Sequence, residues 1–143
     1  MARIEPLAVE EAKGRAKEIL EGPLKGKGFN VYRTLAHSPA ALEGLLAFSG
    51  SLSQGELSAQ EREVIALFMG ERNGCDYCVA AHTKMAELVG MSDAEILAAR
   101  RGEMDDARLT ALLAFVRALD EKRGFVDDGD IHALIDAGYG EPE

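Results

Sequence analysis

The sequence predicts an all-α fold, a single-domain bundle of about six or seven helices over residues 1–143. Three observations support this prediction. Apolar residues recur three and four positions apart along most of the chain, which is the period of a helix face. Serine and aspartate start signals and glycine stop signals divide the chain into helix-sized segments. No stretch of useful length alternates apolar and polar residues as a half-buried strand would.

The first third of the chain is expected to hold two helices and the start of a third. Residues 9–20, rich in Ala, Glu and Lys, form the first helix, and residues 21–28, with Pro23 and three glycines, form a loop. A short helix follows over residues 30–37. Ser38 and Pro39 then supply the cap and the first position of a longer helix. Its apolar stripe is Leu42, Leu45, Leu46, Ser49 and Leu52.

The middle of the chain predicts a pair of helices joined by a tight turn. Ser58 to Glu61 is a capping box, and the helix that it opens is apolar around much of its girth, which favours a central position. Asn73 and Gly74 end this helix, because both tolerate left-handed backbone. A second helix over residues 75–89, stopped by Gly90, would return alongside the first as an antiparallel hairpin.

Three further helix signals follow the hairpin. Ser92 to Glu95 is a second capping box, and Gly102 closes that helix. Asp105 and Asp106 favour the start of a long helix, whose apolar face is Leu109, Leu112, Leu113, Val116 and Leu119. A short helix is expected over residues 130–137, and the acidic pair Asp127 and Asp128 before it is interpreted as a solvated loop.

Composition and charge exclude several classes of partner. The chain is 47% hydrophobic and 29% charged, which is ordinary for a globular protein of one domain. Its net charge of -9 makes nucleic acid and anionic membrane surfaces poor partners. No stretch is long and apolar enough to span a bilayer. The start, Met1 to Pro6, lacks the apolar segment of a signal peptide, so a cytoplasmic location is expected.

The two cysteines of the chain, Cys75 and Cys78, lie three residues apart. A bridge over two intervening residues closes almost no loop, so it would add little stability. In a reducing compartment this spacing indicates redox or metal chemistry. At a helix start, Cys78 would lie one turn beyond Cys75, close enough for a disulfide with modest adjustment. The helix N-terminus would stabilise a thiolate there.

His82 and Glu63 complete a candidate site around the cysteines. His82 follows Cys78 by four residues, so it would share its helix face and exchange a proton with a thiol. Glu63 precedes the Asn73–Gly74 turn by about as many residues as His82 follows it, so both would lie roughly 12–15 Å from the turn. A carboxylate opposite an imidazole fixes its tautomer and raises its basicity. Among the apolar residues of its helix, an unpaired Glu63 would be costly.

Other interpretations of these residues remain open. The cysteines could be two small core residues, or Cys75, Cys78 and His82 could hold zinc with Glu63 as the fourth ligand. Glu63 could be a solvated acid. Tyr77 is expected to be partly buried at the rim, with a lesser prospect of a hydrogen-bonding role. His37 and His132 stand apart from the cluster and are interpreted as surface or packing residues.

The two runs Leu57–Glu63 and Asn73–His82 resemble the AhpD-like alkylhydroperoxidases of the carboxymuconolactone decarboxylase superfamily. The pattern of Glu, eleven residues, Cys-x-x-Cys, three residues and His is met in full. The resemblance is strongest over residues 57–99, and Gly138-Tyr139 fits a peroxidase-related branch less distinctively. It implies an all-α fold built round a helical hairpin and a homo-oligomer, often a trimer or hexamer.

The resemblance also implies an antioxidant activity and a role for each site residue. Cys78 would attack a hydroperoxide and become a sulfenic acid, which Cys75 would resolve as a redox-active Cys75–Cys78 disulfide, with no other cofactor. His82 would transfer protons, oriented by Glu63. A dithiol partner, such as a lipoyl domain or a thioredoxin-like protein, would restore the thiols.

The sequence departs from the family pattern in two places. Tyr77 stands where AhpD has a second histidine, and a phenol with a pKa of about 10 is a poor base near neutral pH. This difference indicates a shorter proton relay and a weaker peroxidase, or another disulfide partner. Family members also commonly continue beyond Gly138-Tyr139 into a further apolar helix, whereas this sequence ends at Glu143. We therefore expect another subunit to cover the core there, or an exposed apolar surface that favours oligomers.

Three functions remain in competition at this point. A thiol peroxidase or dithiol oxidoreductase accounts for the paired cysteines and the acid–base pair together. A lactone decarboxylase of the same superfamily would need general acid–base groups but no thiols. A non-enzymatic module would use the cysteines to hold a structural zinc ion.

Overall fold

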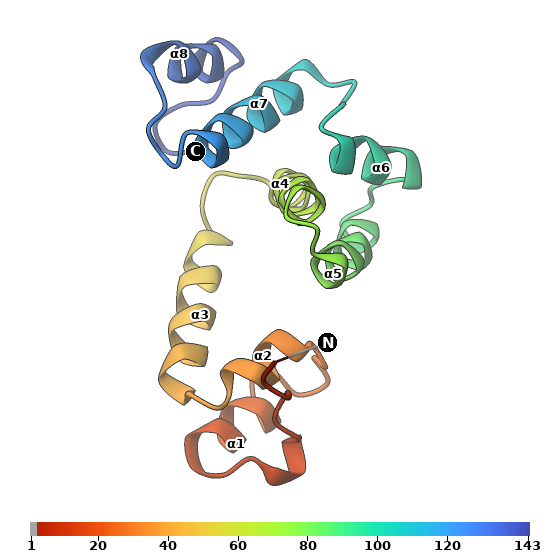
Figure 1. Cartoon of the computed structure of the whole chain (residues 1–143), viewed down its shortest axis with the longest axis vertical. Helices are drawn as coiled ribbons and strands as arrows, with labels where there is room; N and C mark the ends of the chain where they lie inside the picture. The colour runs from red at the N-terminus through yellow and green to blue at the C-terminus, as the bar shows by residue number, and fades with distance from the viewer. Residues whose placement is uncertain (1–2) are drawn as a thin grey trace. The chain divides into compact units, whose positions relative to one another are not determined.

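The computed structural model describes residues 3–143 (Figure 1). Met1 and Ala2, part of the segment considered for a leader, lie outside the described residues. Within residues 3–143 the chain forms eight α-helices, one short 3-10 helix and no strand, which confirms the all-α prediction with one or two more helices than expected. The chain divides into two compact units, residues 1–54 and 55–143, and each is described by itself.

The first unit holds the 3-10 helix Val9–Glu11 and the helices α1 (Gly14–Glu21), α2 (Asn30–Leu35) and α3 (Pro39–Leu52). Its small core is made of aliphatic side chains from α1, from α3 and from the segments that connect the helices: Ala12, Ala16, Ile19, Leu20, Leu24, Ala36 and Leu42. Burial of these side chains is what holds the short helices together, because isolated helices of this length are marginal in water.

The predicted continuous helix over residues 9–20 is interrupted. Ala12 and Lys13 are extended, and Gly14 has a φ of +51°, which is outside the right-handed helical region. The break allows Ala12 to enter the core while the chain changes direction into α1. Alanine, glutamate and lysine favour helix locally, but packing of the small core overrides that preference here.

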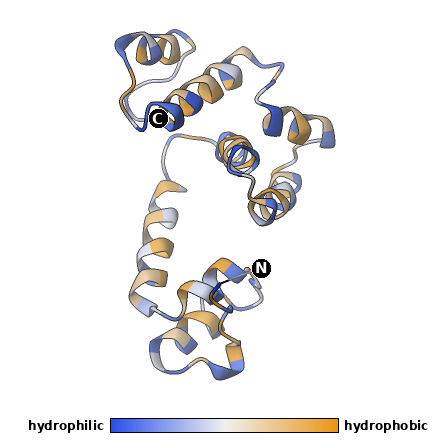
Figure 2. Cartoon of the chain, in the orientation of Figure 1, coloured by the Kyte–Doolittle hydropathy of each residue, from blue (hydrophilic) through white to orange (hydrophobic). Residues whose placement is uncertain are grey.

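Helix α3 begins at Pro39 as predicted, although Ser38 makes no side-chain capping bond. Its apolar stripe is only partly buried within the first unit. Leu42 is fully buried and Leu45 and Leu46 are half-buried, whereas Phe48 and Leu52 are exposed. The hydrophobic stretch of α3 is visible in Figure 2.

The second unit is built around α4 (Ala59–Arg72) and α5 (Asp76–Leu88), followed by α6 (Asp93–Arg101), α7 (Ala107–Glu121) and α8 (Asp128–Asp136). Helix α4 packs against α5, α6 and α7, which gives it the predicted central position (Figure 1). The core of this unit is formed by Val64, Leu67, Phe68, Ala86, Met91, Ile96, Ala99 and Leu113.

Helices α4 and α5 form the predicted hairpin. The Ser58–Glu61 capping box opens α4, Asn73 ends it, and Gly74 takes a φ of +60° in the turn. Near the turn, Gly70 of α4 lies against Val79 of α5. Further from the turn, Glu63 of α4 lies against His82 of α5. That order of contacts shows that the two helices run in opposite directions.

The start of α8 differs from the predicted solvated loop at Asp127 and Asp128. The Asp127 carboxylate accepts a hydrogen bond from the Asp130 backbone, and the Asp130 side chain accepts one from the Asp127 backbone, so the pair forms a capping box. Lys122 forms ion pairs with both carboxylates. Asp128 is the first helical residue, where a negative charge is favoured by the helix dipole.

An apolar cavity of about 540 Å³ lies within the second unit, between α4, α7 and α8. Its walls are mainly carbon and include Ile65, Met69, Phe115, Leu134 and Tyr139.

Among the residues that the structure describes, none of the helices has the length and apolar character that crossing a membrane requires.

Candidate functional site

The hairpin brings Glu63 of α4 and His82 of α5 into contact. Nδ1 of His82 lies 2.8 Å from Oε2 of Glu63, and the side chains are 31% and 15% exposed. Because an ionised carboxylate only accepts hydrogen bonds, Nδ1 carries the proton and donates it to Glu63. Nε2 is then the nitrogen that can take or give a proton in chemistry, as in the orienting role of the acid in a catalytic triad.

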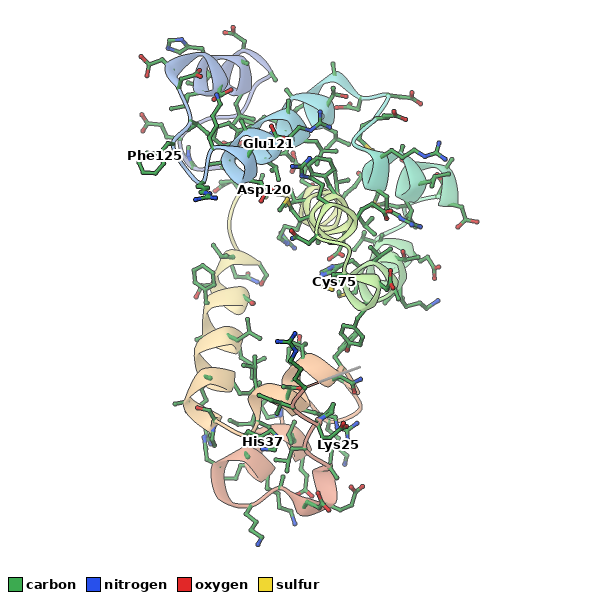
Figure 3. All side chains as sticks on the ribbon, viewed as in Figure 1. Lys25, His37, Cys75, Asp120, Glu121 and Phe125 are labelled. Carbon is green, nitrogen blue, oxygen red and sulfur yellow. A yellow bond between two sulfur atoms is a disulfide. The ribbon has the colours of Figure 1, made fainter. Side chains whose placement is uncertain are left out.

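Cys75 and Cys78 lie at the start of α5 and are joined by a disulfide bond. Cys75 occupies the cap position at the start of α5 (Figure 3). Cys78 lies in the first turn of the helix. The backbone N–H of Cys78 points at Sγ of Cys75, with the nitrogen 3.2 Å from the sulfur. A helix N-terminus favours negative charge, so a thiolate formed at Cys75 would be stabilised there.

Cys78 lies on the side of α5 that packs against α4. A β-carbon added to Gly70 of α4 would lie 3.4 Å from Cβ of Cys78 and 3.3 Å from Cγ2 of Val79. The absence of a side chain at Gly70 therefore lets the start of α5 approach α4 closely. His82 follows Cys78 by four residues, and it reaches Glu63 on α4, so Cys78 and His82 share this face of the helix.

Cys75 lines a cleft of about 440 Å³, with both polar and apolar walls, at the surface of the second unit. The cleft is bounded by the end of α4 at Gly70 and the turn that follows it, by α5 at Val79, Ala80 and Thr83, and by Arg100 of α6. Nε of Arg100 donates to Oε2 of Glu71 at 2.7 Å, so these opposite charges are paired at the rim. Cys75 is the cysteine of the pair that contributes to this cleft.

Other candidate residues lie outside this cluster or differ from expectation. Tyr77, expected to be a partly buried rim residue, lies in the first turn of α5 and is 44% exposed. His37 lies in the first unit, where its ring nitrogen pairs with the backbone oxygen of Glu5. His132 is exposed on α8. Neither histidine joins the redox pair, as the sequence indicated.

The four residues considered as zinc ligands are arranged differently from a metal centre. Cys75 and Cys78 bond to each other, and His82 bonds to Glu63. Among residues 3–143, no group of three or more His, Cys, Asp or Glu side chains is placed to hold a metal ion.

The structure also shows a buried polar cluster that sequence reasoning missed. Glu61 was interpreted only as a capping residue, yet it is 5% exposed and binds two side chains from distant segments. Its Oε1 accepts from Nη1 of Arg108 at 2.8 Å and from the hydroxyl of the buried Tyr139 at 2.9 Å. The Arg108 guanidinium also lies 3.9 Å from the centre of the Tyr139 ring, a cation–π contact.

These contacts shift the pKa values of both acidic groups in the cluster. Burial raises the pKa of Glu61, but hydrogen bonds from Ser58 and Tyr139 and the charge of Arg108 outweigh it, so the pKa lies below the ordinary 4.5. Burial, with the hydrogen bond to Glu61, raises the pKa of Tyr139 far above its ordinary value. Glu61 therefore stays charged and Tyr139 stays a hydrogen-bond donor near neutral pH. The cluster secures the C-terminal segment to the start of α4.

Taken together, the fold and the site define an all-α protein whose central hairpin carries a cysteine pair at a helix start and a Glu–His pair on the same hairpin. Such an arrangement can exchange thiols and disulfides and transfer protons. The profile of the carboxymuconolactone decarboxylase family matches residues 39–121, more than half of the chain. The chain therefore belongs to this family, which lies within the AhpD-like superfamily.

Members of this family are often enzymes, either decarboxylases or peroxidases. A search among curated proteins gave no match. The matched residues include α4, α5 and α6 together with all four residues of the candidate site, Glu63, Cys75, Cys78 and His82.

Proposed function

We propose that the protein is a thiol-dependent hydroperoxidase, a dithiol–disulfide oxidoreductase that reduces organic hydroperoxides. The observation that carries the proposal is the Cys75–Cys78 disulfide at the start of α5, on the same hairpin as the Glu63–His82 pair. A structural disulfide across two intervening residues would contribute little stability, so a chemical role accounts for it better.

The reaction begins with the reduced protein. The Cys78 thiolate attacks the outer oxygen of the hydroperoxide, forming a sulfenic acid, while the O–O bond breaks and an alkoxide leaves. His82, with Nδ1 held by Glu63, takes the proton of the Cys78 thiol at Nε2 as the thiolate forms and then passes it to the alkoxide, which becomes an alcohol. The assignment of Cys78 as the attacking residue follows the family resemblance and its shared face with His82.

Cys75 completes the oxidative half of the cycle. Its thiolate attacks the sulfenic sulfur of Cys78, releases water after protonation of the leaving hydroxide and forms the disulfide. An external dithiol then supplies two electrons and two protons to restore both thiols. We propose a lipoyl domain or a thioredoxin-like protein as this reductant. The Cys75–Cys78 pair is the only redox group that the cycle needs.

Two further properties belong to the same proposal. We propose that the protein forms a homo-oligomer, a trimer or hexamer, which the carbon-walled cavity between α4, α7 and α8 and the exposed Phe48 and Leu52 support. We also propose that it works in the cytoplasm, where a closely spaced cysteine pair is typical of redox chemistry.

The experiment that tests the function is peroxide turnover with a defined reductant. Purified protein is mixed with dihydrolipoamide and cumene hydroperoxide, and consumption of the hydroperoxide is followed. Cys75→Ser and Cys78→Ser should each abolish multiple turnover, because no disulfide can form. Glu63→Gln and His82→Ala should lower the rate by about 10²-fold or more if they transfer protons.

The matched control is His37→Ala, which removes a histidine from the first unit and should leave the rate unchanged. Hydroperoxide consumption that persists in both cysteine variants would overturn the proposal. Single-turnover oxidation that gives a sulfenic acid in Cys75→Ser, trapped with dimedone, would support Cys78 as the attacking residue.

A lactone decarboxylase is the second candidate, and the Glu63–His82 hydrogen bond favours it because that pair can move protons without sulfur. It predicts decarboxylation of a carboxymuconolactone by wild-type protein. It also predicts that Cys75→Ser and Cys78→Ser retain this activity while His82→Ala loses it. The same set of variants therefore separates the two reactions.

A further inference from the structure

The two sulfur atoms of the disulfide lie in different surroundings. Cys78 is on the side of α5 that packs against α4, where a Cβ added to Gly70 would lie 3.4 Å from the Cβ of Cys78. Cys75 lines the cleft between the α4–α5 turn and α6. A thiol from another molecule needs room to approach the sulfur that it attacks, so these surroundings decide which sulfur it reaches.

The cleft has the size and chemistry to admit a small thiol. Its volume of about 440 Å³ lies in the range of small-molecule sites. Its polar groups include Thr83, Asp76 and the Arg100–Glu71 ion pair, and Ala80 and Val79 add short apolar side chains. A thiol on a flexible, uncharged arm could enter without displacing a side chain from the core.

We propose that the reducing thiol attacks Sγ of Cys75 through this cleft, so that the mixed disulfide forms on Cys75 and Cys78 is the leaving group. This inference rests on the proposed function, which identifies a hydroperoxide as the oxidant that forms the disulfide. The exchange step itself involves no peroxide, and it can be tested separately.

The step balances as an ordinary thiol–disulfide exchange. The thiolate of the reductant forms a bond to Sγ of Cys75 while the Cys75–Cys78 bond breaks, and Cys78 leaves as a thiolate on the face that carries His82. The second thiolate of the reductant then attacks the reductant sulfur of the mixed disulfide. Cys75 is released as a thiolate, and the Cys78 N–H, which already points at its sulfur, stabilises that charge. The reductant loses two electrons and the protein gains them.

This order of steps gives the two cysteines different roles. Cys78 is freed first, on the side of His82, where a hydroperoxide is to be attacked. Cys75 receives the reductant in the cleft that it lines. Oxidant and reductant therefore react with different sulfur atoms of the pair.

The first test maps the mixed disulfide on the oxidised wild-type protein. The protein is mixed with N-acetylcysteamine, an uncharged monothiol, and quenched with acid at short times; free thiols are then alkylated. Cleavage by chymotrypsin after Tyr77 separates Cys75 from Cys78, so the two adducts are weighed individually by mass spectrometry. Extrapolated to zero time, at least about ten adducts on Cys75 are expected for each one on Cys78, a difference of about 1.4 kcal/mol in activation free energy. Equal labelling, or a majority on Cys78, would overturn the proposal.

A second measurement tests whether the thiol attacks through the cleft, even if the mixed disulfide does not accumulate. Ala80→Trp narrows the cleft from an exposed position on α5, and it should slow reduction of the disulfide by dihydrolipoamide at least about tenfold. Leu88→Trp is the matched control, since Leu88 is exposed near the other end of the same helix and outside the cleft. Circular dichroism shows whether each variant folds, and Ala80→Leu should give an intermediate rate. Equal rates for Ala80→Trp and Leu88→Trp would overturn the proposal. Absence of peroxide turnover, with adducts still on Cys75, would instead refute only the proposed function.

Discussion

Replacement of Tyr139 by phenylalanine tests the buried cluster around Glu61. The change removes one hydroxyl, and with it the 2.9 Å hydrogen bond to Oε1 of Glu61. Glu61 then keeps its contacts with Ser58 and Arg108 but loses one donor in a site where it is 5% exposed. Hydrogen bonds to charged groups are worth about 1.5–3 kcal/mol, so we expect the free energy of unfolding to fall by about 2 kcal/mol.

Urea denaturation followed by circular dichroism measures this loss. With a urea m-value of about 1–2 kcal/mol/M, the midpoint should fall by about 1–2 M without a change in slope. Tyr32→Phe is the matched control, because Tyr32 is half-buried and its ring packs edge-on against Phe29. That change should alter the free energy of unfolding by less than about 0.5 kcal/mol.

The pH dependence of the loss follows from the lowered pKa of Glu61. Because the pKa is lower in the folded state, the stabilisation from the charged carboxylate is fully present above about pH 4.5 and is lost as the pH falls through the folded pKa. The difference between wild type and Tyr139→Phe should therefore shrink in acid. A difference that is the same at neutral and acidic pH, or the same in a Glu61→Gln background, would refute the hydrogen bond as its cause.

Three further changes have expected outcomes. Gly102→Ala should lower the free energy of unfolding by about 1–3 kcal/mol in urea titration, because Gly102 has a φ of +73° and an added Cβ would lie 2.8 Å from the Phe68 ring; an unchanged midpoint would contradict this. Ser92→Ala removes the cap of α6 and should cost about 1 kcal/mol by the same assay, with Ser92→Thr as the control that retains it. Asp76→Asn removes a negative charge from the cleft beside Cys75. It should therefore speed reduction of the disulfide by anionic dihydrolipoate more than reduction by neutral dihydrolipoamide. An equal change in rate for both reductants would count against an electrostatic effect.

The hairpin and the contact across it could be predicted from the sequence because their signals are local. A capping box at Ser58 and a glycine turn at Gly74 set the ends of two helices of similar length. Once these ends are known, the rise per residue places Glu63 opposite His82, and the structure shows the two side chains 2.8 Å apart. The helix start also explains why Cys75 and Cys78 lie within bonding distance of each other.

Features formed by residues far apart in the chain could not be predicted in this way. Arg108 and Tyr139 reach Glu61 across 47 and 78 residues, and no periodicity or motif relates the three. The cleft at Cys75 depends on Arg100, whose position is set by the packing of α6 on α4. In the first unit, the helical preference of residues 9–20 was overridden by packing of Ala12 and by Gly14.

The long span of the Glu61–Tyr139 bond has a consequence for the folding pathway of residues 55–143. The hairpin contacts between Glu63 and His82 close a loop of 19 residues, whereas the contact between Glu61 and Tyr139 closes one of 78. Because closing a longer loop costs more chain entropy, the hairpin should form early and the contact with Tyr139 late. Interactions formed after the rate-limiting barrier mainly slow unfolding. The cluster therefore raises the activation free energy of unfolding. Loss of the Tyr139 hydroxyl should speed unfolding several-fold while the refolding rate stays nearly constant.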